Sequence, residues 1–344
     1  MQGAVAFGVL LALLSGLMNG LFTLPMRFLG RWSWENAWSV FIVGACLLLP
    51  AAIVTGLAPA SWALLSHAPG RAVLIALGTG FAWGFGAIMF GQSVSAIGIA
   101  LANTFVLAIS SALGSLLPMI FLTPAKLHER AGLTILLGIA VEIVGIALCG
   151  RAGMMRESAA RVHEQAQRGD LVGKRRPLGI ALLLVSGSGI LSAVFNIGFA
   201  LAHPMIDFGQ RNGLTLFSST NLIWVLMLGG GAVSNLGFCA YLVRKNRSAA
   251  KFAQPGSSRL YLLGAIMALL WGGSIFVYGA AAPKLGVLGV SIGWPVSLAT
   301  GLLVANGVGL LLGEWKGTRR GAQGWMFSGV AVLLLAIVIL SKAG

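Results

Sequence analysis

The chain alternates between long apolar stretches and short polar connections, and this alternation predicts its architecture. Ten runs of mainly apolar residues, each close to the ~20 residues that a helix needs to cross the hydrocarbon of a membrane, occur along the 344 residues. They lie at 4–26, 36–56, 72–91, 97–123, 131–150, 178–202, 214–243, 260–281, 285–312 and 324–341. We therefore expect an all-α membrane protein with ten transmembrane helices.

One long polar segment divides these runs into two sets of five. Residues 151–177, with the sequence RAGMMRESAARVHEQAQRGDLVGKRRP, separate the fifth run from the sixth. This pattern predicts an N-terminal five-helix repeat at 1–150, a basic linker at 151–177 and a C-terminal five-helix repeat at 178–344.

A short unit in the first half recurs in the second. Residues 83–98 read WGFGAIMFGQSVSAIG, and residues 271–286 read WGGSIFVYGAAAPKLG. At a constant offset of 188, the following positions coincide: Trp83 with Trp271, Gly91 with Gly279, and Gly98 with Gly286. Such an internal repeat predicts that the two halves share one fold. We expect the functional site where the two copies face each other.

Composition and charge predict how the chain is oriented in the membrane. The chain is 58% hydrophobic and 9% charged, with a net charge of +15, and its Lys and Arg residues fall between the apolar runs, so we expect no nucleic-acid partner. The connections on the linker's side hold 17 Lys and Arg, and the other connections and the C-terminal tail hold 6. Basic residues concentrate on the cytoplasmic side. The linker is therefore expected in the cytoplasm and both termini outside, which inverts one five-helix half relative to the other.

Inverted repeats are typical of secondary transporters, whose substrate site lies near the bilayer midplane. A duplicated membrane scaffold or receptor without transport activity would share this hydropathy pattern, and that alternative stays open. The sequence contains no HExxH, P-loop or nucleophile-elbow motif, so we do not expect an enzyme. The four His residues are scattered, and we expect neither a metal site nor a cofactor.

Polar residues inside apolar runs are informative because a polar side chain in hydrocarbon is costly unless it is paired or lines a cavity. Glu142 is the one carboxylate near the middle of a run. It is interpreted as a protonatable coupling group. The alternative is a neutral glutamic acid whose hydrogen bond joins two helices.

Amide and aromatic side chains inside the runs suggest a site for a neutral polyol. An indole face packs against the C–H side of a sugar ring while amides bind its hydroxyls, although each Trp could equally be a core or lipid-facing residue. The candidate substrate-binding residues are Asn19, Trp83, Asn103, Asn196, Asn221, Trp271, Tyr278 and Trp294. A second group of tryptophans lies near run ends and is expected to anchor the chain at the membrane interface: Trp32, Trp34, Trp38, Trp62, Trp315 and Trp325.

Several short motifs together are similar to those of the L-rhamnose–proton symporter family of the drug/metabolite transporter superfamily. They cover the chain from about residue 30 to 320, in the family's order and at similar spacing. The motifs are Arg31-Trp-Ser-Trp-Glu35, Trp83-Gly84, Gly150-Arg151-Ala152-Gly153, Gly229-Gly-Gly-Ala with Asn235-Leu-Gly-Phe-Cys239, and Gly313-Glu-Trp315.

The resemblance implies ten helices in two inverted repeats and proton-coupled uptake of a 6-deoxyhexose, L-rhamnose or a relative such as L-fucose, across a bacterial inner membrane. It also implies that Trp83, Trp271, Tyr278 and Trp294 match the family's aromatic pattern, whereas Asn103, Asn221 and Glu142 are particular to this chain. The expected partners are a small neutral sugar, protons and the lipid bilayer, and two copies could form a homodimer. An exporter of metabolites or drugs from the same superfamily is the alternative within transport.

Overall fold

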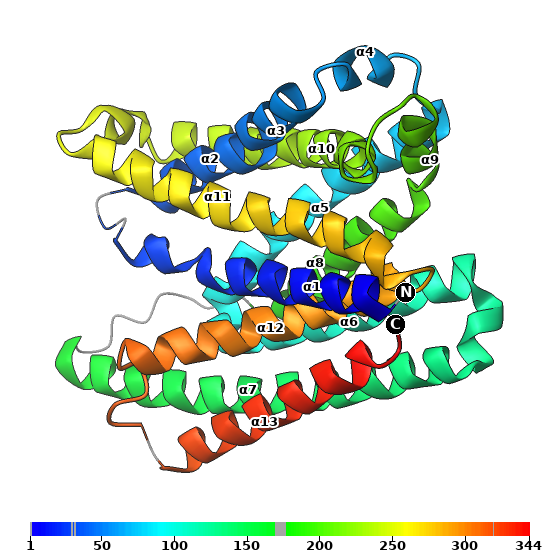
Figure 1. The fold of residues 1–344 in the computed structure, drawn as a ribbon. Helices are drawn as coiled ribbons and strands as arrows, with labels where there is room; N and C mark the ends of the chain where they lie inside the picture. The colour runs from blue at the N-terminus through cyan, green and yellow to red at the C-terminus, as the bar shows by residue number, and fades with distance from the viewer. Residues whose placement is uncertain (1, 29, 31, 169–176, 319) are drawn as a thin grey trace.

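The computed structural model describes residues 2–28, 30, 32–168, 177–318 and 320–344 (Figure 1). Throughout these residues the regular structure is helical, and no strand occurs. Ten helical segments among them are long and apolar enough to cross a membrane. The predicted all-α membrane fold with ten spans is therefore confirmed.

The first half supplies five spans. The elements are α1 (Gln2–Leu21), η1 (Leu24–Phe28), α2 (Trp34–Ile42), η2 (Val43–Leu48), α3 (Leu49–Leu57), α4 (Ser61–Leu65), α5 (Gly70–Ile97), α6 (Ile99–Leu122), η3 (Pro124–His128) and α7 (Arg130–Arg168). The second span is built from three consecutive elements, α2, η2 and α3. The short helix α4 lies in the connection after it, and the 3-10 turn η3 lies in the connection between α6 and α7.

The second half supplies the other five spans. Its elements are α8 (Leu178–Leu201), α9 (Pro204–Arg211), α10 (Leu216–Lys245), η4 (Ala249–Ala253), α11 (Ser257–Ala281), η5 (Ala282–Leu285), α12 (Gly289–Leu311) and α13 (Arg320–Ser341). The structure differs from the predicted linker in one respect. α7 continues as a single helix to Arg168, so residues 151–168 of the linker are helical. Residues 169–176 lie outside the described residues.

The second span contains a wider turn that the apolar pattern does not indicate. Residues 43–48 form a π-helical turn, and Pro50 follows it at the start of α3. Because proline cannot donate the usual helical hydrogen bond and its ring collides with the preceding turn, a local widening accommodates it. The turn also lies close to α11, since a Cβ on Gly44 would come 2.6 Å from the Cβ of Ala268.

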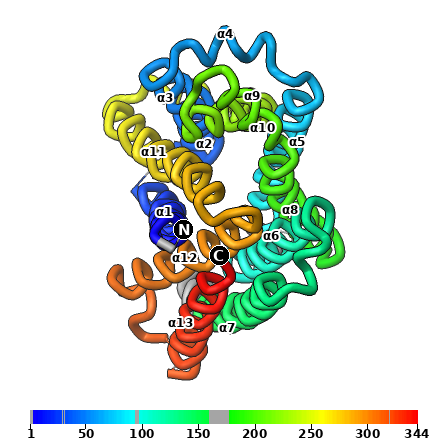
Figure 2. Tube along the Cα trace, turned by 45° about the vertical axis from the view of Figure 1, so that its right-hand side comes forward, coloured from blue at the N-terminus to red at the C-terminus, as the bar shows by residue number. Residues whose placement is uncertain are grey.

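Helix contacts cross from one half to the other. α1 lies against α11 and α12, and α8 lies against α5 and α6. α5 packs on α10, while the second span, α2 with η2 and α3, packs on α11. α7 and α13 lie together at one edge of the bundle (Figures 1 and 2). The first four spans of each half therefore interleave, and the fifth spans pair with each other outside them.

Two glycines turn the chain between adjacent spans of each half. Gly98 joins α5 to α6 with φ 90° and ψ 159°, and Gly286 joins η5 to α12 with φ 79° and ψ −158°. Only glycine adopts this region of backbone space readily. The two residues that coincide in the sequence repeat thus have the same unusual backbone conformation.

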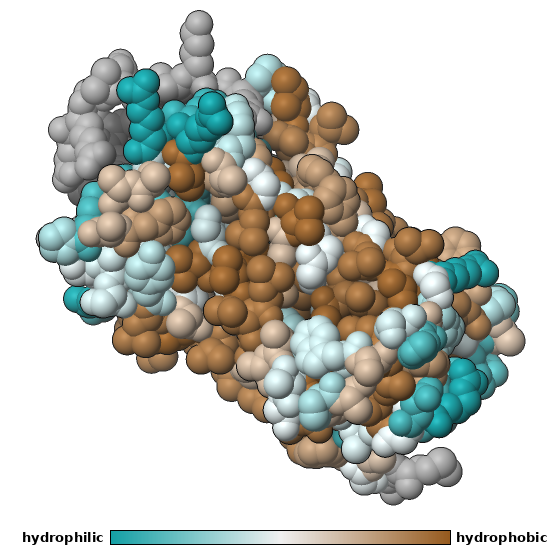
Figure 3. All heavy atoms as spheres, turned by 90° about the horizontal axis from the view of Figure 1, so that it is seen from above, coloured by the Kyte–Doolittle hydropathy of each residue, from teal (hydrophilic) through white to brown (hydrophobic). Residues whose placement is uncertain are grey.

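The surface of the bundle is apolar in its middle and hydrophilic at its two ends (Figure 3). Leu74, Leu183 and Leu311 are among the large apolar side chains that remain exposed, which suits contact with lipid. Both termini lie at one end (Figure 1), where Gly344 is next to Val5. We call this the terminus end. The opposite end, which carries the α1–α2, α10–α11 and α12–α13 connections and the C-terminal part of α7, we call the linker end.

Candidate functional site

A stacked pair of tryptophans lies where the two halves meet. Trp83 is near the middle of α5 and Trp271 near the middle of α11. Their ring centroids are 5.0 Å apart, and the ring planes differ by 13°. These are the residues that open the two copies of the sequence repeat. The two copies therefore face each other through their first side chains.

Aromatic rings and a glycine surround this tryptophan pair. Phe41 meets Trp271 edge to face at a centroid distance of 5.6 Å, and Phe195 lies 5.1 Å from Trp83. Gly231 of α10 gives the Trp83 indole its space, because a Cβ there would come 2.7 Å from the ring. Trp271 is only 9% exposed. The pair is thus held between α2, α8 and α10 in the interior of the bundle.

A tyrosine–asparagine contact lies closer to the terminus end. The Tyr278 hydroxyl donates to Oδ1 of Asn196 at 2.5 Å, and Nδ2 of Asn196 donates to the Gly114 carbonyl at 2.9 Å. Both side chains are buried. Since the amide uses its oxygen toward α11 and its nitrogen toward α6, Asn196 connects helices of both halves.

Trp294 meets the Tyr278 ring edge to face, with centroids 5.4 Å apart. Its Nε1 donates to the Ser110 carbonyl at 3.2 Å and approaches the Ser110 hydroxyl at 3.3 Å. Ser110 in turn donates to the Ser192 hydroxyl at 2.9 Å. Gly114 allows the approach, since a Cβ there would lie 2.9 Å from the Trp294 nitrogen. The indole of Trp294 is therefore fixed in both position and orientation.

Two buried polar side chains of α10 lack hydrogen-bond partners. Trp224 stacks on Phe199 at a centroid distance of 4.3 Å and lies against Gly279, where a Cβ would overlap its ring nitrogen. Neither Nε1 of Trp224 nor Oδ1 of Asn221, one helical turn earlier, has a partner. An unsatisfied buried polar group is uncommon and calls for an explanation. These two atoms are therefore a buried donor and a buried acceptor that no group of the described residues satisfies.

Two further candidate residues, Asn19 and Asn103, take no part in the contacts described above. Asn19 is on the α1–α12 contact, where its amide nitrogen faces Gly301. Asn103 is partly exposed on α6, about two turns from Ser110 toward the linker end. We use the name central cluster for the six candidates on the mutually packed helices α5, α8, α10, α11 and α12, namely Trp83, Asn196, Asn221, Trp271, Tyr278 and Trp294.

Glu142 is fully buried, behind α6 as seen from the central cluster. The Ser111 hydroxyl donates to its Oε2 at 2.5 Å, while Oε1 has no partner. Apolar residues of α7, α12 and α13 form the core around this part of α7, including Ile139 and Ile146. Ser111 directly follows Ser110, which binds Trp294. One short segment of α6 therefore separates Glu142 from the central cluster.

The sequence did not single out the phenylalanines that pack against the central cluster, and it gave two outer tryptophans the wrong role. Phe195 and Phe199 cannot be told from ordinary core residues in an apolar run, because their packing depends on tertiary contacts. The expectation that Trp32 and Trp315 are interfacial anchors is wrong, because both side chains are buried. Trp38 is partly buried and donates to Oδ1 of Asn235 at 3.0 Å.

The central cluster offers aromatic faces, two amides and a phenol, and none of its members is ionisable near neutral pH. The chemistry of these side chains suits a neutral ligand with both apolar faces and hydroxyl groups. Among the described residues, no three His, Cys, Asp or Glu side chains come together in a way that could hold a metal ion.

These features define the class of protein: a ten-span α-helical membrane protein with an aromatic and amide cluster between its halves. Comparison with known proteins gives the family. The model of the L-rhamnose-proton symport protein (RhaT) family matches residues 1–343. Proteins named L-rhamnose-proton symporter from Klebsiella pneumoniae subsp. pneumoniae, Salmonella enteritidis PT4 and Shigella flexneri are each 26% identical over 343 residues, covering 98% of this chain and 97% of theirs. The chain therefore belongs to the L-rhamnose-proton symport protein family, as its motifs indicated.

Proposed function

We propose that this protein imports L-rhamnose together with protons and binds the sugar in the central cluster. The observation that carries the proposal is the stack of Trp83 on Trp271, near the middle of α5 and α11 and at the contact between the two halves. Midplane sites between repeats are the usual substrate sites of secondary transporters. The relatives' name, L-rhamnose-proton symporter, supplies the substrate and the coupling ion.

L-Rhamnose suits the chemistry of this site. The C–H face of its ring and its methyl group can pack on the indoles, and its hydroxyls can replace hydrogen bonds that now join side chains. Tyr278 and Asn196 currently satisfy each other, and Asn221 and Trp224 offer an unpartnered acceptor and donor. L-Fucose carries the same groups in another stereochemistry, so it is the natural competitor to test.

Import by alternating access needs two halves that can exchange equivalent positions, and several matched contacts support an inverted repeat. Ser15 of α1 donates to the Ser274 carbonyl at 2.9 Å, and Ser188 of α8 donates to the Gly86 carbonyl at 2.8 Å. The two acceptors, Gly86 and Ser274, are separated by the repeat offset of 188. The shared backbone conformation of Gly98 and Gly286 and the interleaved helix contacts agree with this arrangement.

We further propose that Glu142 carries the coupled proton. Ser111 and Ser110 are neighbours on α6; one binds Glu142 and the other binds Trp294. Gain or loss of the proton would alter the Ser111 contact and thereby the position of this segment. A permanently protonated Glu142 that only joins α6 to α7 is the competing explanation, and the two are separated by a substitution described below.

Uptake into proteoliposomes tests the proposal. Purified protein should accumulate labelled L-rhamnose when the outside is made acidic, and a protonophore should abolish the accumulation. Excess unlabelled L-rhamnose should compete strongly, and excess L-fucose more weakly. Export of metabolites without rhamnose uptake would instead identify an exporter, and no flux of any solute would identify a membrane scaffold.

A further inference from the structure

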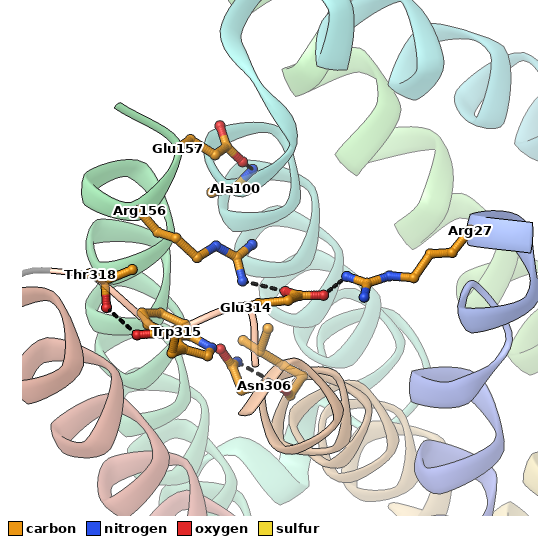
Figure 4. Close-up of polar contacts among 9 residues, drawn as sticks. Arg27, Ala100, Arg156, Glu157, Asn306, Glu314, Trp315 and Thr318 are labelled. Atoms are coloured by element: carbon orange, nitrogen blue, oxygen red, sulfur yellow. Dashed lines mark hydrogen bonds and ion pairs between the residues drawn. The ribbon is translucent and has the colours of Figure 1, made fainter. Parts of the chain in front are cut away.

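A carboxylate outside the central cluster joins three separate elements at the linker end (Figure 4). Glu314, in the connection between α12 and α13, forms ion pairs with Arg27 of η1 and Arg156 of α7. The Arg156 Nη1 lies 2.5 Å from Oε2 of Glu314, and Arg27 binds the other carboxylate oxygen. One side chain therefore links the end of the first span, the end of the fifth span and the connection that precedes the tenth.

The fold positions Glu314 for this role. Its backbone N–H donates to the Gly309 carbonyl at 2.9 Å, so the connection folds back on the end of α12. Gly313 and Gly317 flank it with φ values of 74° and 77°, which favour glycine. Gly309 leaves room for the carboxylate, because a Cβ there would come 3.0 Å from Oε2.

The C-terminal part of α7 makes two further contacts at the linker end, one through Arg156 and one through Glu157. The Arg156 guanidinium lies 5.0 Å above the ring of Trp315, a geometry that attracts a cation to an aromatic face. The next residue, Glu157, accepts from the Ala100 N–H at 2.7 Å, where α6 begins. The C-terminal part of α7 is therefore tied both to α6 and to the α12–α13 connection.

The matching connection at the terminus end is arranged differently. Glu129 lies between the fourth and fifth spans of the first half, as Glu314 does in the second half. Glu129 pairs with Lys126, three residues away, at 2.8 Å. At the same end, His203, which directly precedes α9, lies 3.7 Å from Asp207 of that helix. These contacts join residues three or four positions apart, whereas those of Glu314 join distant elements.

We propose that Glu314 is a gating residue of the transport cycle: it holds the linker end closed in this conformation, and it must release Arg27 and Arg156 before the sugar can leave at that end. The inference rests on the proposed transport function. It assigns to Glu314 a positioning role, since the residue lies outside the central cluster and acts through the ends of α1, α7 and α12.

The Arg27–Glu314 ion pair is weak enough to open and close during a transport cycle. The side chains of Arg27 and Glu314 are 46% and 21% exposed, so water and salt can compete with the ion pair. The helices that would move carry central contacts: Ser15 of α1 contacts the hydroxyl of Ser297 on α12 at 2.9 Å, and Trp294 belongs to α12. Separation of the linker-end parts of α1 and α12 would therefore shift side chains at the central cluster, including Trp294.

Thiol labelling of a position beneath the gate tests the inference. Asn306 lies on α12 close to Glu314 and is partly buried (Figure 4). Asn306→Cys would be introduced with Cys46, Cys149 and Cys239 replaced by alanine, and its reaction with a maleimide measured in lipid nanodiscs, where both faces are accessible. Arg27→Gln removes one partly exposed ion pair and should raise the labelling rate by about fivefold. Glu314→Gln removes both ion pairs and should raise the rate at least as much.

The double variant Arg27→Gln with Glu314→Gln should label no faster than Glu314→Gln alone, because Glu314→Gln already removes both ion pairs. Glu129→Gln, which breaks the pair at the opposite end, is the matched control and should leave the rate unchanged. If one variant fails to fold, the other still decides. Labelling rates equal to that of the parent in the folded variants would overturn the inference.

L-Rhamnose uptake by the parent protein keeps the two proposals separate. A parent that takes up no rhamnose while Glu314→Gln still accelerates labelling would reject the proposed substrate and support the gate. A parent that transports rhamnose while the gate variants label at the parent's rate would reject the gate alone. In a transporting parent, Glu314→Gln should also raise the half-saturating outside concentration of sugar, because less protein remains closed at the linker end.

Discussion

At the scale of single residues, Tyr278, Asn196 and Trp294 of the central cluster already have hydrogen-bond partners within the protein. Tyr278 binds Asn196, and Trp294 binds Ser110, so a sugar that enters exchanges existing hydrogen bonds for new ones. Such an exchange has a small net free energy. We therefore expect aromatic stacking to contribute much of the affinity, and amide and hydroxyl groups to decide which sugar is accepted.

Replacement of Trp271 tests the aromatic contribution. Trp271→Ala removes half of the stacked pair with Trp83, and loss of a stacking partner worth on the order of 1 kcal/mol should raise the half-saturating L-rhamnose concentration by roughly fivefold. Trp271→Phe should have a smaller effect. Trp62→Ala serves as control, because Trp62 is exposed near α4 and should leave the value unchanged. A well-folded Trp271→Ala with normal half-saturation would remove this residue from the site.

Replacement of Glu142 separates proton coupling from a structural role. Glu142→Gln keeps the side chain's size and can still accept from Ser111, but it cannot titrate. If Glu142 couples, the variant should exchange labelled for unlabelled sugar and yet lose accumulation driven by a pH gradient. Both assays use the same proteoliposomes, so exchange is the internal control.

Accumulation that persists in Glu142→Gln with its normal pH dependence would make Glu142 structural. The coupling group would then be sought among the other candidates near span ends. Glu35 is the first to examine, since it is buried and accepts from Ser248 and Asn246. The remaining ones are Glu314, Asp207 and His203.

At the scale of elements, the sequence predicts the spans well and the side-chain contacts poorly. Runs of about 20 apolar residues locate the helices because length and hydropathy alone decide whether a helix can cross a membrane. The π-helical turn at 43–48 was not predicted, because it depends on Pro50 and on the approach of α11. Asn196 and Asn19 looked equivalent in sequence, but only the packing of α8 brings Asn196 to Tyr278.

Glycines determine how closely α5 and α10 approach. A Cβ on Gly80 would overlap the Met227 carbonyl of α10, whereas Gly78, on the same helix, has nothing within 4 Å. Gly80→Ala should therefore lower the free energy of unfolding by roughly 2 kcal/mol, as overpacking of a tight contact does. Gly78→Ala is the matched control and should be neutral. Thermal unfolding in detergent would measure both, and equal melting temperatures would contradict this account of the contact.

At the scale of the whole molecule, the linker end is held together by contacts between connections of the two halves. Lys251 of the α10–α11 connection donates to Ser33 at 2.6 Å, and Trp32 donates to the Lys251 carbonyl at 3.0 Å. Together with the Glu35–Ser248 bond of 2.7 Å and the Glu314 ion pairs, these contacts concentrate polar links between halves at one end. This end also carries most of the basic connections.

The same charge distribution predicts the orientation of the protein in the membrane. Connections on the linker's side hold 17 Lys and Arg, against 6 in the other connections and the C-terminal tail, and basic residues near span ends stay preferentially on the cytoplasmic side. The linker end should therefore face the cytoplasm and both termini the outside. Cysteine would replace Lys126, which is partly exposed near the terminus end, and Arg247, which is exposed near the linker end. In intact cells, a membrane-impermeant maleimide should label Lys126→Cys and spare Arg247→Cys, and permeabilised cells should label both. The opposite pattern would reverse the orientation, and Glu314 would then close the outer face instead of the cytoplasmic one.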